Sequence, residues 1–210
     1  MISTAHPLLR FWSASLAALL VVLTLIATPA PAQEAYFEMD TLNSGLPAPP
    51  EGMDRSTPMG AVESFLYRTR RSEFSQAAHL LDLSDIDVGD QVATGEELAR
   101  QLYVLMDRKV VIPWDSLSDR PDGWLSGTSD NDATGRIRRS VRLDWLDLDN
   151  HGVPLRLNRV KPGDAPPVWV FARQSVANIP DLFERYGPTS LEMALPSWAR
   201  GRAFWGMYVW

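Results

Sequence analysis

An acidic stretch that begins at Asp85 has some of the residue types that bind calcium. Asp85, Asp87 and Glu96 occupy the first, third and twelfth places of a calcium loop, whose ligands are oxygen atoms. The sixth place, where the sharp turn needs glycine, is Asp90, and Gly89 stands where a ligand is needed. We therefore interpret this stretch as an acidic surface loop between two helices.

Residues 130–135 match two further patterns. As a calcium loop they have glycine at the sixth place, but the twelfth place is Val141, so the bidentate carboxylate is missing. As a phosphotransfer nucleophile in an Asp-x-Asp-x-Thr motif, Asp130 should follow a buried apolar strand, and residues 124–129 do not form such a pattern. We interpret the stretch as a polar turn.

Other catalytic and metal-binding patterns are missing. The chain has no cysteine, which excludes disulfides, thiolate metal sites and a cysteine nucleophile. His79 falls in a predicted helix and His151 in a predicted turn, and neither has the spacing of zinc ligands. A nucleophile elbow and a phosphate-binding glycine loop are also lacking. We predict that the protein is not an enzyme and has no catalytic residue, metal site or cofactor, and the sequence identifies no ligand-binding residue.

The composition is that of a globular protein with a core. The chain has 210 residues, of which 45% are apolar and 22% are charged. This length suggests one domain with appendages. The net charge of −6, with no basic block apparent, argues against nucleic acid as a partner because binding to phosphates needs clustered cations.

The first 32 residues have the pattern of a secretory signal peptide. Arg10 precedes an apolar run over 11–27, and the small residues Ala30 and Ala32 come just before Gln33. An uncleaved membrane anchor is the alternative, although the run is short for a membrane span. Both interpretations place the chain from Gln33 onward outside the cytoplasm.

Residues 33–56 contain three prolines and predict a poorly ordered, Pro-rich linker. A periplasmic α+β domain is predicted over 57–195. We expect N-terminal helices at 58–71, at 73–81 and from Thr94, where Glu97 completes a capping box. An antiparallel sheet follows, then a C-terminal helix. A curved sheet over helices, as in nuclear-transport-factor-like folds, is one arrangement that fits.

The expected strands cover residues 109–114, 136–147, 153–160 and 168–172, with a turn at 150–152. The last helix spans 175–186, with a restart at Pro180 and a cap at Gly187. Trp145 and Trp169 fall in strands and are expected in the core. Trp114 and Trp124 flank a long loop, which they either pin down or use to line a ligand cleft.

The C-terminal segment, residues 196–210, is rich in aromatic residues. Trp and Tyr favour the headgroup layer of a membrane, and Arg beside them can extend to the interface. The segment therefore predicts a juxtamembrane region, and the alternative is a last core strand over 203–210. The predicted membrane-interface residues are Trp198, Arg200, Arg202, Trp205, Tyr208 and Trp210.

Several stretches resemble the periplasmic region of certain bacterial small-conductance mechanosensitive channels. They occur in a consistent order and none is a catalytic signature. The stretches are residues 57–66, 74–83, 97–102, 105–108, 117–123, 167–172, 179–187 and 195–198.

The resemblance implies an extracytoplasmic N-terminal domain that modulates or anchors a membrane pore not contained in this chain. It implies the periplasm, at the bacterial inner membrane, as the location. The implied partners are the membrane or a membrane-embedded channel domain, and further copies of the chain. A free-standing periplasmic module that binds a ligand or a protein remains an alternative. A hydrolase that uses the acids near Asp130 is a third hypothesis, which rests on a weak motif alone.

Overall fold

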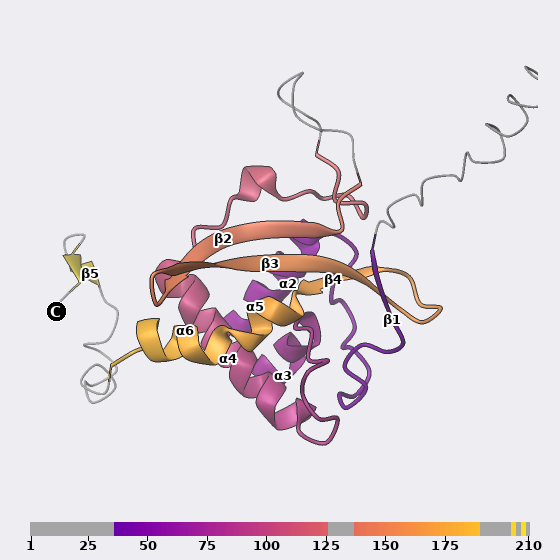
Figure 1. Cartoon of the computed structure of the whole chain (residues 1–210), viewed down its shortest axis with the longest axis horizontal. Coiled ribbons are helices and arrows are strands. Elements are labelled where there is room, and N and C mark those ends of the chain that lie inside the picture. Colours follow the sequence, from indigo (N-terminus) through magenta and orange to yellow (C-terminus); the bar gives the residue numbers. More distant parts are fainter. Residues whose placement is uncertain (1–35, 126–136, 190–202, 205–206, 209–210) are drawn as a thin grey trace, which may run out of the picture. The chain divides into compact units, whose positions relative to one another are not determined.

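The computed structural model describes residues 36–125 and 137–189, together with the backbone of 203–204 and 207–208 (Figure 1). The described chain is α+β, as predicted, with helices, then a sheet, then helices. The helices are α2 (Pro58–Arg70), α3 (Phe74–Ala77), α4 (Gln91–Lys109), α5 (Arg173–Ala177) and α6 (Ile179–Tyr186), with short 3-10 turns η1 (Ala78–Leu80) and η2 (Trp114–Ser116). The strands are β1 (Phe37–Met39), β2 (Ser140–Leu148), β3 (His151–Pro162), β4 (Val168–Phe171), β5 (Ala203–Phe204) and β6 (Met207–Tyr208).

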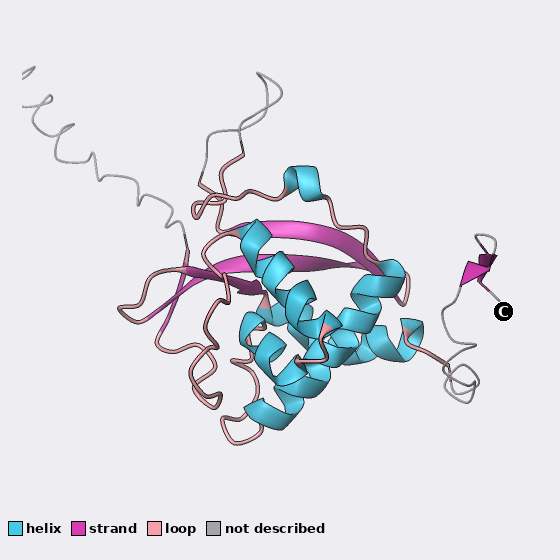
Figure 2. Cartoon of the chain, turned by 180° about the vertical axis from the view of Figure 1, so that it is seen from behind, coloured by secondary structure: helices cyan, strands magenta, loops and turns pink. Residues whose placement is uncertain are grey.

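The predicted cap of the first helix is confirmed. The Thr57 hydroxyl accepts a hydrogen bond from the Gly60 amide at 2.9 Å, and Pro58 takes the first helical position. The helix then buries its apolar side chains, among them Phe65, which contacts the Phe171 ring edge-on at a centroid distance of 5.0 Å. Figures 1 and 2 show the helices on one side of β2 and β3, where this core lies.

Helix α4 begins at Gln91, so the predicted start at Thr94 with a capping box is wrong. The Gln91 side chain donates to the carbonyls of Leu83 (3.1 Å) and Ile86 (3.2 Å), and its oxygen accepts from the Gly45 amide at 2.8 Å. These tertiary bonds fix the first turn three residues before Thr94. The predicted apolar face, which includes Leu98 and Leu102, is buried as expected.

The four-stranded sheet is mixed rather than purely antiparallel. β3 pairs antiparallel with β2 and β4 and parallel with β1. The β2–β3 turn lies at Asp149 and Asn150, which both have positive φ, one residue before the predicted turn. The predicted strand at 109–114 is absent. Residues 110–113 instead leave α4 as an extended connection, in which the Val111 amide donates to Asp144 Oδ2 at 2.9 Å.

The expectation that 33–56 form a poorly ordered linker is wrong for its described part, residues 36–56. Phe37–Met39 form β1, and the Asn43 side chain is 7% exposed. Its amide donates to the Leu81 carbonyl at 2.7 Å and its oxygen accepts from the Leu83 amide at 2.9 Å. The segment is ordered because its polar groups bond to elements far along the chain.

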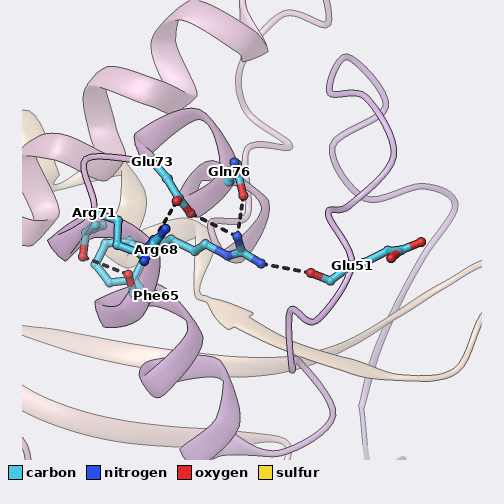
Figure 3. Close-up of polar contacts among 7 residues, drawn as sticks. Glu51, Phe65, Arg68, Arg71, Glu73 and Gln76 are labelled. Atoms are coloured by element: carbon cyan, nitrogen blue, oxygen red, sulfur yellow. Dashed lines mark hydrogen bonds and ion pairs between the residues drawn. The ribbon is translucent and has the colours of Figure 1, made fainter.

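Arg68 attaches the end of the same segment to the helices. Figure 3 shows its guanidinium between three partners: it donates to Glu51 O (3.0 Å), Glu73 Oε2 (3.0 Å) and Gln76 Oε1 (2.7 Å). Arg71 holds the other oxygen of Glu73 at 2.8 Å, and these two arginines lower the pKa of the Glu73 carboxyl, Arg71 more than Arg68. One side chain of α2 therefore contacts both α3 and the proline-rich segment.

A β-bulge between Arg142 and Asp144 changes which side chains of β2 face the helices. Leu143 and Leu146 are buried, whereas Trp145 is 51% exposed. The prediction that Trp145 is a core residue is therefore wrong, because the extra residue of a bulge turns the following side chain to the opposite face. The same prediction for Trp169 is confirmed, since this side chain is 0% exposed.

We predict that Asn43→Ala lowers the free energy of unfolding by about 2 kcal/mol, because two buried backbone groups lose their partner. Urea denaturation of the purified chain measures the change. Thr41→Ala, an exposed position of the same segment, is the control and should stay within about 0.5 kcal/mol of the wild type. Equal stability of both variants and the wild type would contradict the docking of residues 36–56.

The two tryptophans of the sheet should differ strongly in their contribution to stability. Trp169→Ala empties a fully buried site and should cost about 3–5 kcal/mol, whereas Trp145→Ala removes a half-exposed ring and should cost under about 1 kcal/mol. Thermal and urea unfolding measure both. Similar losses for the two variants would argue against the bulge at Arg142–Asp144.

Candidate functional site

The predicted membrane-interface residues lie almost wholly outside the described residues. Trp198, Arg200, Arg202, Trp205 and Trp210 belong to that undescribed part, and Tyr208 is described only through the backbone of β6. Strands β5 and β6 pair antiparallel and form a separate two-stranded sheet. The alternative prediction, a single core strand over residues 203–210, is therefore wrong. Among the described helices, each is too short or too polar to cross a bilayer.

The acidic stretch after Asp85 has partners other than a metal. Arg173 Nη1 lies 3.2 Å from Asp85 Oδ1, and Glu96 lies within α4, where Arg100 binds it at 3.0 Å. Within residues 36–125 and 137–189, no group of three or more His, Asp or Glu side chains could hold a metal ion. The second acidic stretch, residues 130–135, lies outside the described residues.

His79 is buried and His151 is exposed. Burial lowers the pKa of His79, and the nearby Arg55 charge adds to the effect. Arg55 in turn donates to the His79 carbonyl at 3.2 Å, and both residues line a hollow of about 460 Å³ against the proline-rich segment. Because the Arg55 side chain bonds to the backbone and the hollow brings no titratable group besides Arg55 against His79, we assign the hollow no chemistry.

A cleft of about 830 Å³ opens on the face of β3 opposite the hydrophobic core. Alternation along β3 explains this position: Leu155 and Leu157 face the core, whereas the intervening side chains of Arg156 and Asn158 line the cleft. The remaining walls come from β1, the start of β2, the loop after η1 and the start of α5. The cleft thus gathers residues that lie far apart in the sequence.

Two arginines stand directly opposite each other at this face. Arg142 of β2 is the register partner of Arg156 of β3. The backbone of Arg156 bonds away from β2, because its amide donates to Ser175 Oγ (3.0 Å) and its carbonyl accepts from Ala172 (2.9 Å). The arginines therefore form a non-hydrogen-bonded pair, the geometry in which opposite side chains lie closest. Like charges in that position repel.

Aromatic rings hold two guanidinium groups at this face. Arg139, which lines the cleft, lies 4.7 Å from the centroid of the Phe37 ring, and Arg142 lies 5.1 Å from that of Trp145. Stacking engages the face of the planar guanidinium and leaves its N–H edge available to an acceptor. Among the described residues, the half-buried Arg156 side chain has no hydrogen-bond or ion-pair partner.

The acids of the cleft do not neutralise these arginines. Asp85 pairs with Arg173, and the buried carboxylate of Asp82 accepts hydrogen bonds from the amide and hydroxyl of Ser84. Glu38 also lines the cleft, at the register position of Lys161 in the parallel β1–β3 pair. The cleft therefore has three carboxylates and three arginines in its walls. Its positive charge is concentrated at Arg139 and Arg156, for which the described residues supply no carboxylate partner, so this side of the cleft can bind an anionic oxygen group.

Sequence reasoning missed this site. Arg136, Arg138, Arg139 and Arg142 are four arginines within seven residues, a local basic cluster inside an acidic chain. Arg136 lies outside the described residues. The cluster was the available signal, but the position of Arg156 opposite Arg142 follows only from the pairing of β2 with β3.

Trp114 and Trp124 do not line this cleft. Trp124 instead holds the end of the preceding loop: its carbonyl accepts from Ser118 Oγ at 2.6 Å and its amide donates to Asp122 Oδ1 at 3.1 Å. For Trp124, these bonds favour the role of pinning the loop over that of lining a ligand cleft.

Comparison of the chain with models of known protein families, with curated proteins and with solved structures found no match.

We predict that Arg156→Gln raises the free energy of unfolding by about 0.2–1 kcal/mol in dilute sodium chloride, because it removes the repulsion from Arg142. The gain should shrink as the salt concentration rises and screens the pair. Urea denaturation at low and high salt measures both effects, with Arg70→Gln, an exposed arginine of α2, as the control. A variant less stable than the wild type at low salt would contradict the unbalanced pair.

Proposed function

We propose that the chain is the extracytoplasmic N-terminal domain of a bacterial small-conductance mechanosensitive channel, where it modulates or anchors a membrane pore outside these residues. The proposal rests on the resemblance of ordered stretches between residues 57 and 198 to the periplasmic region of such channels. It carries with it a location in the periplasm at the inner membrane. The proposed partners are the membrane or a membrane-embedded channel domain, and further copies of the chain, without a cofactor or enzymatic activity.

The observation that supports the proposal most is that the resembling stretches build the core of the fold. They cover the beginning of α2, part of α4, and all of α3, η1, β4 and α6. Buried residues from each of these stretches belong to one hydrophobic cluster, among them Phe65, Leu81, Leu102, Phe171 and Leu182. A resemblance carried by residues that pack together is what a shared fold would produce.

A domain of this kind can influence a tension-gated pore only through a difference in free energy between the closed and open states. Such a difference requires that the domain contacts the pore or the membrane differently in the two states. Hydrogen bonds made by Arg68 and Asn43 attach residues 36–56 to the helical part of the domain. The domain would therefore respond to the pore or the membrane as a unit.

A free-standing periplasmic binding module is the second candidate function. The observation that favours it is the cleft of about 830 Å³ over β3, a volume in the range of small-molecule sites. This function needs no pore and is compatible with the same signal peptide.

Deletion of residues 36–189 from the native full-length protein should shift the membrane tension at which the channel opens, because contacts that differ between the two states are lost. Patch recordings of the deletion variant and of the wild type measure the shift. Arg70→Gln, at an exposed position of α2, is the control, and equal amounts of each protein in the membrane fraction must be verified.

An unchanged threshold would contradict modulation of gating and leave anchoring as the role. The reading frame beyond codon 210 of the native transcript separates the two candidate functions. Apolar stretches of about 20 residues downstream would support the channel, and a stop codon directly after Trp210 would support the free-standing module.

A further inference from the structure

We propose that the cleft over β3 binds the phosphate group of an anionic molecule, with Arg139 and Arg156, which line it, and Arg142, the cross-strand neighbour of Arg156, as its recognition residues. This goes beyond the proposed channel function, which assigns no ligand. Arg142 pairs in register with Arg156, and Arg139, just before β2, lines the same cleft as Arg156 beside the Phe37 ring.

The repulsion between Arg142 and Arg156 is the first argument for an anion. Two guanidinium groups on a non-hydrogen-bonded cross-strand pair destabilise the sheet unless a negative charge lies between them. Among the described residues no carboxylate is paired with either group, while nearby Asp85 is paired with Arg173. An anion from outside the described chain would remove the repulsion and gain two charge-assisted interactions.

Preorganisation is the second argument. The guanidinium carbons of Arg139 and Arg142 lie over the rings of Phe37 and Trp145, 4.7 Å and 5.1 Å from the ring centroids. Side chains held in this way lose less conformational entropy on binding than free ones. The N–H edges of the stacked groups stay available for hydrogen bonds to ligand oxygens.

The type and number of donors favour phosphate over carboxylate. A phosphate monoester carries up to two negative charges and three terminal oxygens, so it can bind more than one guanidinium at once. Ser140 and Asn158, which also line the cleft, form the register pair next to Arg142 and Arg156. Their polar side chains add neutral hydrogen-bond donors on the same face, where a phosphate has oxygens left to accept them.

The size of the cleft indicates a phosphate that is part of a larger molecule. Its volume of about 830 Å³ greatly exceeds what one phosphate group needs. Phe37, Met39 and Val160 supply apolar walls beside the arginines. A soluble organic phosphate and the headgroup of an anionic phospholipid both combine these features, and both present the same chemistry to the arginines.

Thermal unfolding of the purified chain in sodium phosphate and in sodium chloride of equal ionic strength tests the proposal. Phosphate should raise the Tm in a saturable manner, because a ligand that binds only the folded state stabilises it. Arg156→Gln should lose this rise while its Tm in chloride equals or exceeds that of the wild type, which shows that the variant folds. Arg142→Gln should reduce the rise, and Arg70→Gln should retain it in full.

Three outcomes would overturn the proposal. The first is an equal Tm in phosphate and chloride. The second is a phosphate response that survives in both Arg156→Gln and Arg142→Gln, which would place the anion elsewhere. The third is an equal response to sodium acetate, which would make the site a general carboxylate site. None of these outcomes bears on the tension threshold, so the channel proposal stands or fails separately.

Two probes distinguish the source of the phosphate. Isothermal titration with glycerol 3-phosphate reports a soluble ligand, and co-sedimentation with phosphatidylglycerol vesicles, compared with phosphatidylcholine vesicles, reports a lipid headgroup. Binding that depends on Arg156 in either assay supports the proposal. The assay that gives this result shows whether the phosphate belongs to a soluble molecule or to a lipid headgroup. Failure of both probes to bind in an Arg156-dependent way would overturn the assignment of an organic phosphate.

Discussion

Strand β3 is hydrogen-bonded by every other strand of the four-stranded sheet, and its register sets both faces of that sheet. Leu155 and Leu157 point into the helical core, and Arg156 between them points into the cleft. A shift of one residue would exchange these faces, burying a guanidinium and exposing two leucines. The hydrophobic core therefore determines where the arginine lies, and Ser175 reinforces the register by bonding the backbone at both Pro154 and Arg156.

The proline-rich segment completes the cleft. Its β1 strand pairs with β3 in parallel and brings the Phe37 ring against Arg139. Bonds from Asn43 and Arg68 hold the rest of the segment to the helices. The candidate site thus depends on contacts between residues more than a hundred positions apart in the sequence, and it cannot form before the sheet is assembled.

The two proposals rest on different residues. The resemblance to mechanosensitive channels is carried by stretches of the helical layer and β4, which form the core. The three arginines lie on β2, β3 and the residue just before β2, outside all of those stretches. Core residues are required by the fold itself, whatever the function of the domain. The arginines on the open face of the sheet are not required by the fold, so a binding function has to explain them. The cleft can therefore be specific to this chain even if the fold is shared.

The sequence by itself determined the α+β class, the capped helix α2, the buried face of α4, the position of β4 and the burial of Trp169. Each depends on a local period or on a short-range cap, which a single sequence displays directly. Only the tertiary structure decided that Trp145 is exposed, that residues 36–56 are ordered and that Arg142 faces Arg156. A bulge, a docked proline-rich segment and a cross-strand pair are all set by the partner strand or helix, and a local pattern carries no information about that partner.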